Sequence, residues 1–181
     1  MTNDSKTSVQ DALDRLTRLM AADDWLDDLN PTQKAALAYL ARANRFSRAP
    51  SQVADYLAAT RGTVSQTLKA LARKGFVEPM VSPSDKRWVS YEMTDKGCAA
   101  LNQATATENA IAKLSDASMA GLENGLQNLL KELLKNRDNK AFGICRDCTY
   151  HQKISSGGHC RLLNEPLTKP DADLICHEFA A

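Results

Sequence analysis

The chain has 181 residues, of which 43% are hydrophobic and 25% are charged, and these fractions are ordinary for a soluble globular protein. Every apolar run is shorter than the roughly 20 residues that cross a membrane, and the first residues resemble no secretory signal, so we expect a cytoplasmic protein without a membrane partner. The net charge is only +1, but residues 42–96 hold 10 Lys and Arg against 5 Asp and Glu, whereas residues 1–41 hold 4 against 7. Positive charge therefore gathers in one part of the chain, as in nucleic-acid-binding modules.

The first 30 residues predict one amphipathic helix and an acidic connection. Residues 1–7 look frayed, and residues 8–24 carry a one-sided apolar stripe, made of Val9, Leu13, Leu16, Leu19 and Met20. This stripe covers either the core of its own domain or a second copy of the chain. The four aspartates of residues 23–28 lack the ligand spacing of a calcium loop, and we interpret them as solvated charge.

A second helix is predicted over residues 32–43, after an Asn30-Pro31 start. Ala36, Leu37 and Leu40 would face inward. Three arginines lie at its end and just after it, at positions 42, 45 and 48. They are either phosphate contacts, which position a protein on DNA without reading its sequence, or exposed side chains. We keep Arg48 as a DNA-binding candidate.

The next stretch predicts a helix-turn-helix. Residues 51–58 and 61–74 have helical apolar spacing, Thr60 can cap the second helix, and Gly75 ends it. In the second helix Val64, Leu68 and Leu71 recur on one face. The opposite face carries side chains that can reach base edges and phosphates, namely Arg61, Thr63, Ser65, Gln66 and Lys69.

A β-hairpin is predicted next, with strands at residues 76–77 and 88–93. Residues 81–87 connect them and place Lys86 and Arg87 at a polar tip. A helix-turn-helix followed by a basic hairpin is a winged helix. We therefore expect a mainly α fold in which residues 31–97 form a winged helix-turn-helix with a small β-hairpin wing.

The stretches ATRGTVSQTLKALARKGFVE, SDKR and MTDKG resemble the MarR family of bacterial transcription regulators, in the family's order and spacing. The resemblance covers about residues 8–137. It implies that Arg87 enters the minor groove, that Asp85 supports the wing by holding a basic partner, and that the N-terminal helix joins a dimer interface. It also implies a small-molecule effector in some members, although no residue here requires one.

Two long helices are expected after the wing, over residues 95–114 and 117–137. The second carries more apolar positions than one small domain can cover, namely Met119, Leu122, Leu126, Leu129, Leu130, Leu133 and Leu134. A two-fold homodimer through residues 1–30 and 98–138 explains them. Two recognition helices about 34 Å apart would then favour an inverted-repeat operator.

Residues 139–181 differ from the rest, because they hold four of the five cysteines. Cys145 and Cys148 form a CxxC pair, with Cys160 and Cys176 standing singly after it. We expect a loop-rich segment, which at this size needs a covalent or metal cross-link to fold stably. A metal held by Cys145, Cys148, Cys160 and Cys176 serves better than disulfides in the cytosol.

The ligand order, one CxxC and two single cysteines, resembles small iron–sulfur modules, and we favour a [4Fe–4S] cluster. Structural zinc is the alternative, since four thiolates suit both, and metal-free thiols stay open. His151, His159 and His177 are each expected at the surface, and Cys98 as a small buried hydrophobe.

These observations predict a dimeric DNA-binding transcription regulator, a repressor, with a redox- or iron-responsive centre hanging from the dimer helix. A winged-helix protein with a structural zinc is one alternative. Another is an electron-transfer or docking subunit that does not bind DNA. Nothing in the sequence predicts an enzyme, because we find neither a phosphate-cradling glycine loop nor a nucleophile elbow.

Overall fold

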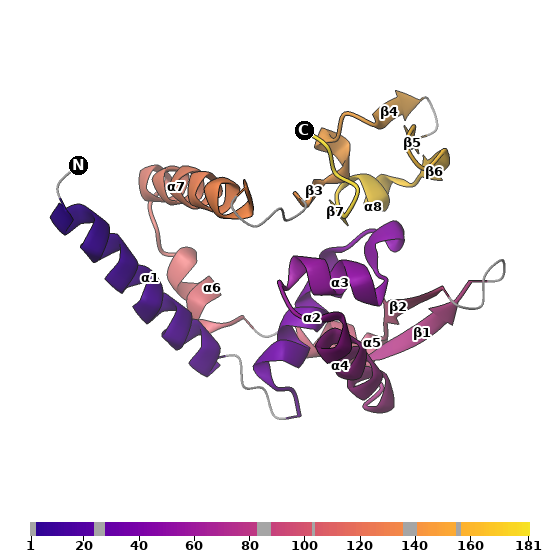
Figure 1. The fold of residues 1–181 in the computed structure, drawn as a ribbon, viewed down its shortest axis with the longest axis horizontal. Coiled ribbons are helices and arrows are strands. Elements are labelled where there is room, and N and C mark those ends of the chain that lie inside the picture. The colour runs from indigo at the N-terminus through magenta and orange to yellow at the C-terminus, as the bar shows by residue number, and fades with distance from the viewer. Residues whose placement is uncertain (1–2, 24–27, 83–87, 103, 136–140, 155–156) are drawn as a thin grey trace.

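A computed structural model describes residues 3–23, 28–82, 88–102, 104–135, 141–154 and 157–181 of the chain. The predicted wing-tip residues Asp85, Lys86 and Arg87 lie outside the described residues, as does most of the acidic connection. In the described part, helices predominate and the strands form three small antiparallel sheets (Figure 1).

The predicted winged helix-turn-helix is confirmed as a fold. Helices α2 (Pro31–Arg42), α3 (Pro50–Tyr56) and α4 (Arg61–Arg73) follow one another, with a short 3-10 helix, η1 (Arg45–Ser47), between α2 and α3. Strands β1 (Val77–Val81) and β2 (Val89–Met93) then pair antiparallel, with Pro79 opposite Tyr91. We call residues 31–93 the winged-helix domain.

Local side-chain chemistry explains where these helices start and stop. Asn30 caps α2 through a bond from Gln33 N to its Oδ1 of 2.9 Å, and the Gln33 side chain accepts from Asn30 N in return. Thr60 caps α4 in the same way, accepting from Thr63 N at 3.2 Å. Gly75 follows α4 with φ of +77°, a backbone conformation that glycine adopts without steric cost.

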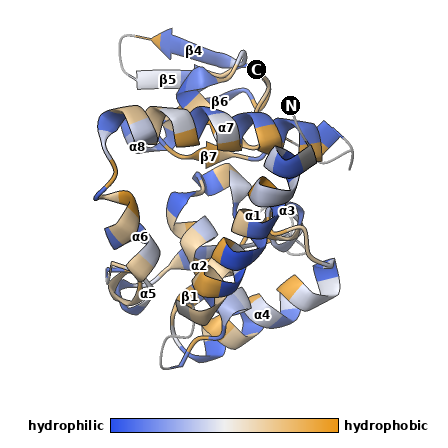
Figure 2. Cartoon of the chain, turned by 90° about the vertical axis from the view of Figure 1, so that its left-hand side faces the viewer, coloured by the Kyte–Doolittle hydropathy of each residue, from blue (hydrophilic) through white to orange (hydrophobic). Residues whose placement is uncertain are grey.

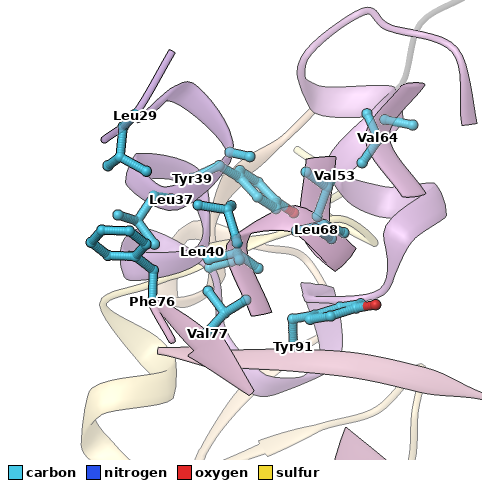
Figure 3. Packing of buried hydrophobic residues seen from close by; sticks show 14 of the residues in the cluster. Leu29, Leu37, Tyr39, Leu40, Val53, Val64, Leu68, Phe76, Val77 and Tyr91 are labelled. Atoms are coloured by element: carbon cyan, nitrogen blue, oxygen red, sulfur yellow. The ribbon is translucent and has the colours of Figure 1, made fainter. Parts of the chain in front are cut away.

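The core of the domain is built from the predicted inward faces. Ala36, Leu37 and Leu40 of α2 and Val64, Leu68 and Leu71 of α4 are all 0% exposed. Phe76, Val77 and Tyr91 close the core from the wing side (Figure 3). The i, i+4, i+7 spacing in α4 therefore marks the buried face, and the polar face of the same helix remains at the surface.

The helices outside this domain differ from the prediction in their bounds. Helix α1 (Asn3–Asp23) begins five residues earlier than expected. The expected continuous helix over residues 95–114 is wrong, because the structure has α5 (Asp95–Ala100) and α6 (Ala106–Ile111) instead. Thr105 explains the break, since it forms a capping box with Glu108 that starts a new helix.

Helices α1, α6 and α7 (Asp116–Lys135) share little surface with the winged-helix domain, and they lie apart from it in Figure 1. Both α6 and α7 hold no buried residue. Orange apolar positions are consequently visible along α1 and α7 (Figure 2). No helix in the described residues combines the length and the apolarity needed to cross a membrane.

Residues 141–181, here called the cysteine segment, are more regular than the loop-rich segment we expected. Strand β3 (Gly143–Ile144) pairs with β7 (Ile175–Cys176), and β5 (Gly157–Cys160) pairs with β4 (His151–Ile154) and β6 (Glu165–Leu167). Two short helices complete it, η2 (Cys145–Asp147) and α8 (Lys169–Ala172). Figures 1 and 2 both place the β4–β5–β6 sheet and α4 at opposite ends of the molecule.

We predict that Leu68→Ala lowers the free energy of unfolding by about 2–5 kcal/mol, because a fully buried leucine leaves a cavity when truncated. Urea denaturation followed by circular dichroism measures this. Gln66→Ala, at an exposed position of the same helix, is the matched control and should change stability by less than about 0.5 kcal/mol. Equal effects of the two substitutions would contradict the packing.

Candidate functional site

The first candidate surface is the outer face of α4. Arg61, Thr63, Gln66 and Lys69 are exposed there, as predicted, and Ser65 is half-buried. The Thr63 hydroxyl lies 2.8 Å from the Thr60 hydroxyl, so the start of the helix is held by its own side chains. The remaining exposed groups are hydrogen-bond donors and acceptors of the kind that read base edges in a major groove.

Arg42 ends α2, and Arg45 and Arg48 follow it; all three bond to other parts of the protein. Arg42 donates from its Nη2 to the Tyr56 hydroxyl at 3.2 Å. Arg45 donates from its Nη2 to Pro166 O at 2.6 Å. Arg48 donates from its Nε to Ala43 O at 3.0 Å and is half-buried. These bonds hold the protein together, and a DNA contact of Arg48 stays a prediction.

The second candidate site is formed by the four cysteines of the cysteine segment. Cys145, Cys160 and Cys176 are buried together, with Leu167 among them, and aromatic side chains of Phe46, Tyr150 and Phe179 pack around the cluster. Cys148 is half-buried, and its thiol is close enough to influence that of Cys145. The spacing of the sequence therefore brings all four predicted thiols into one region.

The electrostatics of this region disfavour free thiolates. Burial raises the pKa of Cys145 to about 12, and the neighbouring thiols of Cys176, Cys160 and Cys148 act in the same direction. Burial also raises the pKa of Cys176, against the opposing effect of nearby hydrogen-bond donors. A buried thiol with a raised pKa is a poor nucleophile, and it ionises readily only where a metal replaces its proton.

Polar groups of the surrounding chain lie near two of the sulfur atoms. Ala180 N lies 3.4 Å from Cys148 Sγ and donates to it. The Asn44 and Ser47 side chains and the Glu178 backbone lie near the Cys176 thiol and favour its ionised form. Hydrogen bonds of this kind stabilise metal-bound thiolates, so the chemistry of the residues fits a thiolate-held metal centre.

The described residues include no set of three or more His, Cys, Asp or Glu side chains gathered closely enough to hold a single metal ion. Around a tetrahedral zinc with Zn–S bonds of 2.3 Å, the sulfur atoms lie about 3.8 Å apart. The four thiols share one region without that tight arrangement.

The histidines and Cys98 are placed only partly as expected. The prediction that His177 lies at the surface is wrong, because this residue is only 7% exposed. His151 is half-buried, with its Nδ1 lying 3.1 Å from Cys145 O, and His159 is also half-buried. The prediction that Cys98 is buried is wrong as well, because its thiol side chain is exposed at the start of α5.

The cysteine segment is attached directly to the winged-helix domain through the main chain. Asn44 N donates to Ile175 O at 2.9 Å, and Ala43 pairs with Ile175 in a parallel bridge. His177 N donates to Ser47 Oγ at 2.9 Å. The segment therefore does not simply hang from the dimer helix, as the sequence suggested. Strand β7 pairs through Ile175 with Ala43, the first residue of the loop 43–48, which we call the docking loop.

Charged and aromatic side chains reinforce this attachment. Arg45 Nη1 lies 3.3 Å from Asp171 Oδ2, and Asp171 is only 5% exposed. Phe142 packs edge-on against Tyr56, with ring centroids 5.1 Å apart, and against His177 at 5.3 Å. The His177 Nε2 in turn lies 3.1 Å from Asp55 Oδ2 of α3. An ion pair between exposed Arg45 and buried Asp171 and a mixed aromatic cluster thus join the two units.

A pocket of about 560 Å³ opens beside this junction. Its walls come from α3, from the end of α7 and from strands β3 and β7. The lining is mainly apolar, with Tyr56, Phe142 and Ile175 on one side and leucines of α7 on the other. Its size lies within the range of small-molecule sites.

Comparison with known proteins agrees with this architecture. Residues 27–87 match the sequence model described as MarR family, and these residues span most of the winged-helix domain. A comparison with curated proteins gave no match. The part of the chain that matches the family is thus the part whose outer face carries the polar side chains of α4.

Solved structures of similar fold come from several organisms. S. aureus MepR, solved in complex with DNA, is 21% identical, with a TM-score of 0.55 over 71% of this chain and 97% of MepR. The transcriptional regulator BldR from Sulfolobus solfataricus is 18% identical, with a TM-score of 0.56 over 73% and 99%. BpsR of Bordetella bronchiseptica, whose structure concerns regulation of DNA binding by 6-hydroxynicotinic acid, is 20% identical, with a TM-score of 0.53 over 67% and 98%. These likenesses show the fold of the chain, a winged helix-turn-helix.

Sequence reasoning missed the residues that join the two units. Asn44, Asp171 and His177 are polar, and in the sequence they resemble surface residues. The Asn-x-x-Ser spacing of Asn44 and Ser47 is a possible turn signal, and Thr168-x-x-Asp171 has the form of a capping box. Neither pattern indicates a partner more than a hundred residues away.

We predict that Phe142→Ala loosens the cysteine segment. Loss of aromatic packing worth about 1.5 kcal/mol raises roughly tenfold the fraction of molecules in which the cysteine segment is detached. Limited proteolysis should then cleave residues 141–181 faster by the same factor. Leu162→Ala, at a position 45% exposed in the same segment, is the control and should leave the rate unchanged. Unaltered cleavage of the Phe142 variant would show that the aromatic cluster does not hold the segment.

Proposed function

We propose that this chain is a dimeric DNA-binding transcription regulator of the MarR family, whose four C-terminal cysteines hold a [4Fe–4S] centre. The observation that carries the DNA-binding part is the outer face of α4. Polar and basic side chains are exposed on the helix that a winged helix-turn-helix presents to the major groove. S. aureus MepR, which shares the fold, is solved in complex with DNA.

The homodimer is supported by apolar side chains that the single chain leaves in water. Val9, Leu16 and Leu19 of α1 are more than half exposed, and five leucines of α7 are between 38% and 56% exposed. Contiguous apolar surface of this kind marks an interface. A second copy of the chain, packed on α1, α6 and α7, would cover it and bring two α4 helices to one duplex. Occupying an operator in this way leads to repression when the site overlaps a promoter.

The metal part of the proposal is supported by the donor set. Three thiols are buried together with a half-buried fourth, Cys148, beside them, and polar groups of the chain lie near two of the four. When bound, a [4Fe–4S] cluster supplies a group whose charge and integrity depend on oxidants and iron supply. The chain itself orients the thiols, excludes water from Cys145, Cys160 and Cys176, and connects Cys176 to the DNA-binding unit.

The alternatives make different use of the same residues. A structural zinc would use the same four sulfur atoms around one ion, and the metal content of the purified protein distinguishes it from a polynuclear cluster. An electron-transfer or docking subunit would not need the polar face of α4. A small-molecule effector remains a further proposal, favoured by the pocket between α3 and α7 and by its apolar lining.

DNA binding is tested with a duplex selected from a random library by the purified protein. We predict an inverted repeat and an affinity that falls steeply with salt, because phosphate contacts release counterions. Gln66→Ala should weaken binding by about 1–3 kcal/mol and relax the base preference at one position of each half-site. Gln152→Ala, at an exposed position of strand β4 at the opposite end of the molecule from α4, is the control. Absence of selected sequences at low salt would contradict the proposal.

The metal centre is tested by the composition of protein purified without oxygen. We predict about four irons per chain and a brown colour, as a [4Fe–4S] cluster requires, and loss of both in Cys160→Ser. Cys98→Ser should keep the iron, since Cys98 lies outside the cluster. A colourless protein with one zinc per chain would contradict the iron–sulfur centre and would indicate a structural zinc site instead.

A further inference from the structure

One buried polar group in the described residues has no hydrogen-bond partner. The Asn44 side chain is 0% exposed. Its Oδ1 accepts from Phe46 N at 3.1 Å and from Ser47 Oγ at 2.8 Å, which starts the η1 turn. Its amide Nδ2 has no partner. Leaving a buried N–H unpaired costs about 1–3 kcal/mol, so this position calls for an acceptor.

The group beside this amide is the Cys176 thiol. Asn44 N bonds to Ile175 O and Ser47 Oγ accepts from His177 N, so the docking loop holds the chain on both sides of Cys176. The Asn44 side chain lies near the thiol, and the Ser47 hydroxyl proton is already donated to Asn44 Oδ1. A protonated thiol is a weak acceptor, whereas a thiolate is a strong one. A metal-bound Cys176 sulfur would therefore offer the buried Asn44 amide the acceptor that it lacks.

We propose that Asn44 is the outer hydrogen-bond donor to the Cys176 thiolate of the metal centre, and that the docking loop transmits the presence of the centre to the wing. This inference rests on the metal centre proposed above. It assigns part of the centre's surroundings to the winged-helix domain, so that the two units share one site.

The docking loop is also bonded to the elements that contact DNA. Tyr91 N of strand β2 donates to Arg48 O at 3.1 Å, and Gln52 Nε2 of α3 donates to Phe46 O at 2.8 Å. Tyr39 of α2 donates through its hydroxyl to Ser47 O at 2.7 Å. Loss of the centre removes the acceptor of Asn44, and any shift of the loop is passed to α3 and the base of the wing through these bonds.

The test uses Asn44→Asp in the full chain purified without oxygen. Aspartate keeps the Oδ1 acceptor that starts η1, and it replaces the N–H donor with a second oxygen facing the thiolate. Asn44→Ser is the second variant, because serine also starts a turn but is too short to replace the amide. Asn30→Asp is the matched control, since Asn30 caps α2 in the same way and lies outside the cysteine cluster.

Iron content, rate of iron loss to a chelator and midpoint potential are measured for each protein. Outer donors are worth roughly 10–100-fold in metal affinity, so we expect iron loss to accelerate by about that factor in both Asn44 variants. The midpoint potential should fall, because a donor to the sulfur atom is removed. Asn30→Asp should match the wild type.

The DNA arm compares loaded and stripped protein on the selected operator. We expect the wild-type affinity to change on stripping, and the loaded Asn44→Ser protein to bind closer to the stripped wild type. Wild-type iron loss and potential in both Asn44 variants would overturn this inference and leave the metal centre standing. A wild-type chain that binds neither iron nor zinc would overturn the centre, and with it this inference.

Discussion

The structure depends on the hydrogen bond from Asn44 N to Ile175 O and the short parallel bridge around it. This contact joins a strand of the cysteine segment to the loop between the first two helices of the winged-helix domain. It buries Ile175 in the same core as Leu37 and Leu68, and it brings Cys176 next to Asn44 and Ser47. Without it, the four cysteines would form a separate appendage, and the DNA-binding unit would be indifferent to their state.

Two different strengths of attachment follow from this arrangement. The cysteine segment is bound to the winged-helix domain by main-chain bonds, by the Arg45–Asp171 ion pair and by the rings of Phe142 and His177. Helices α1 and α7, in contrast, leave much of their apolar surface exposed in the single chain, and a second copy would cover it. In the proposed dimer, the packing of α1 and α7 would set the distance between the two α4 helices, and the cysteine segment would act on each winged-helix domain by itself.

The sequence predicts the winged-helix domain well because the signals that define its helices lie within each helix or directly beside it. Apolar spacing in residues 32–43 and 61–74 marks the buried faces, and Asn30 and Thr60 mark the helix starts. The four cysteines were also recognisable as candidate metal ligands, since a CxxC pair with two further cysteines is typical of a metal site. The break between α5 and α6 was missed because the apolar pattern continues across it. The docking contacts were missed because they join Asn44, Ser47 and Asp55 to residues more than a hundred positions later, and such pairings leave no periodic signal in one sequence.

The most direct test of this account is hydrogen exchange of the full chain with its metal centre present and after its removal. The account predicts that removal speeds amide exchange in the cysteine segment, in residues 43–48 and in strand β2, whose Tyr91 N bonds to Arg48 O. Faster exchange confined to residues 141–181, with residues 43–48 and β2 unchanged, would contradict it. In that case the cysteines would serve only the stability of their own segment.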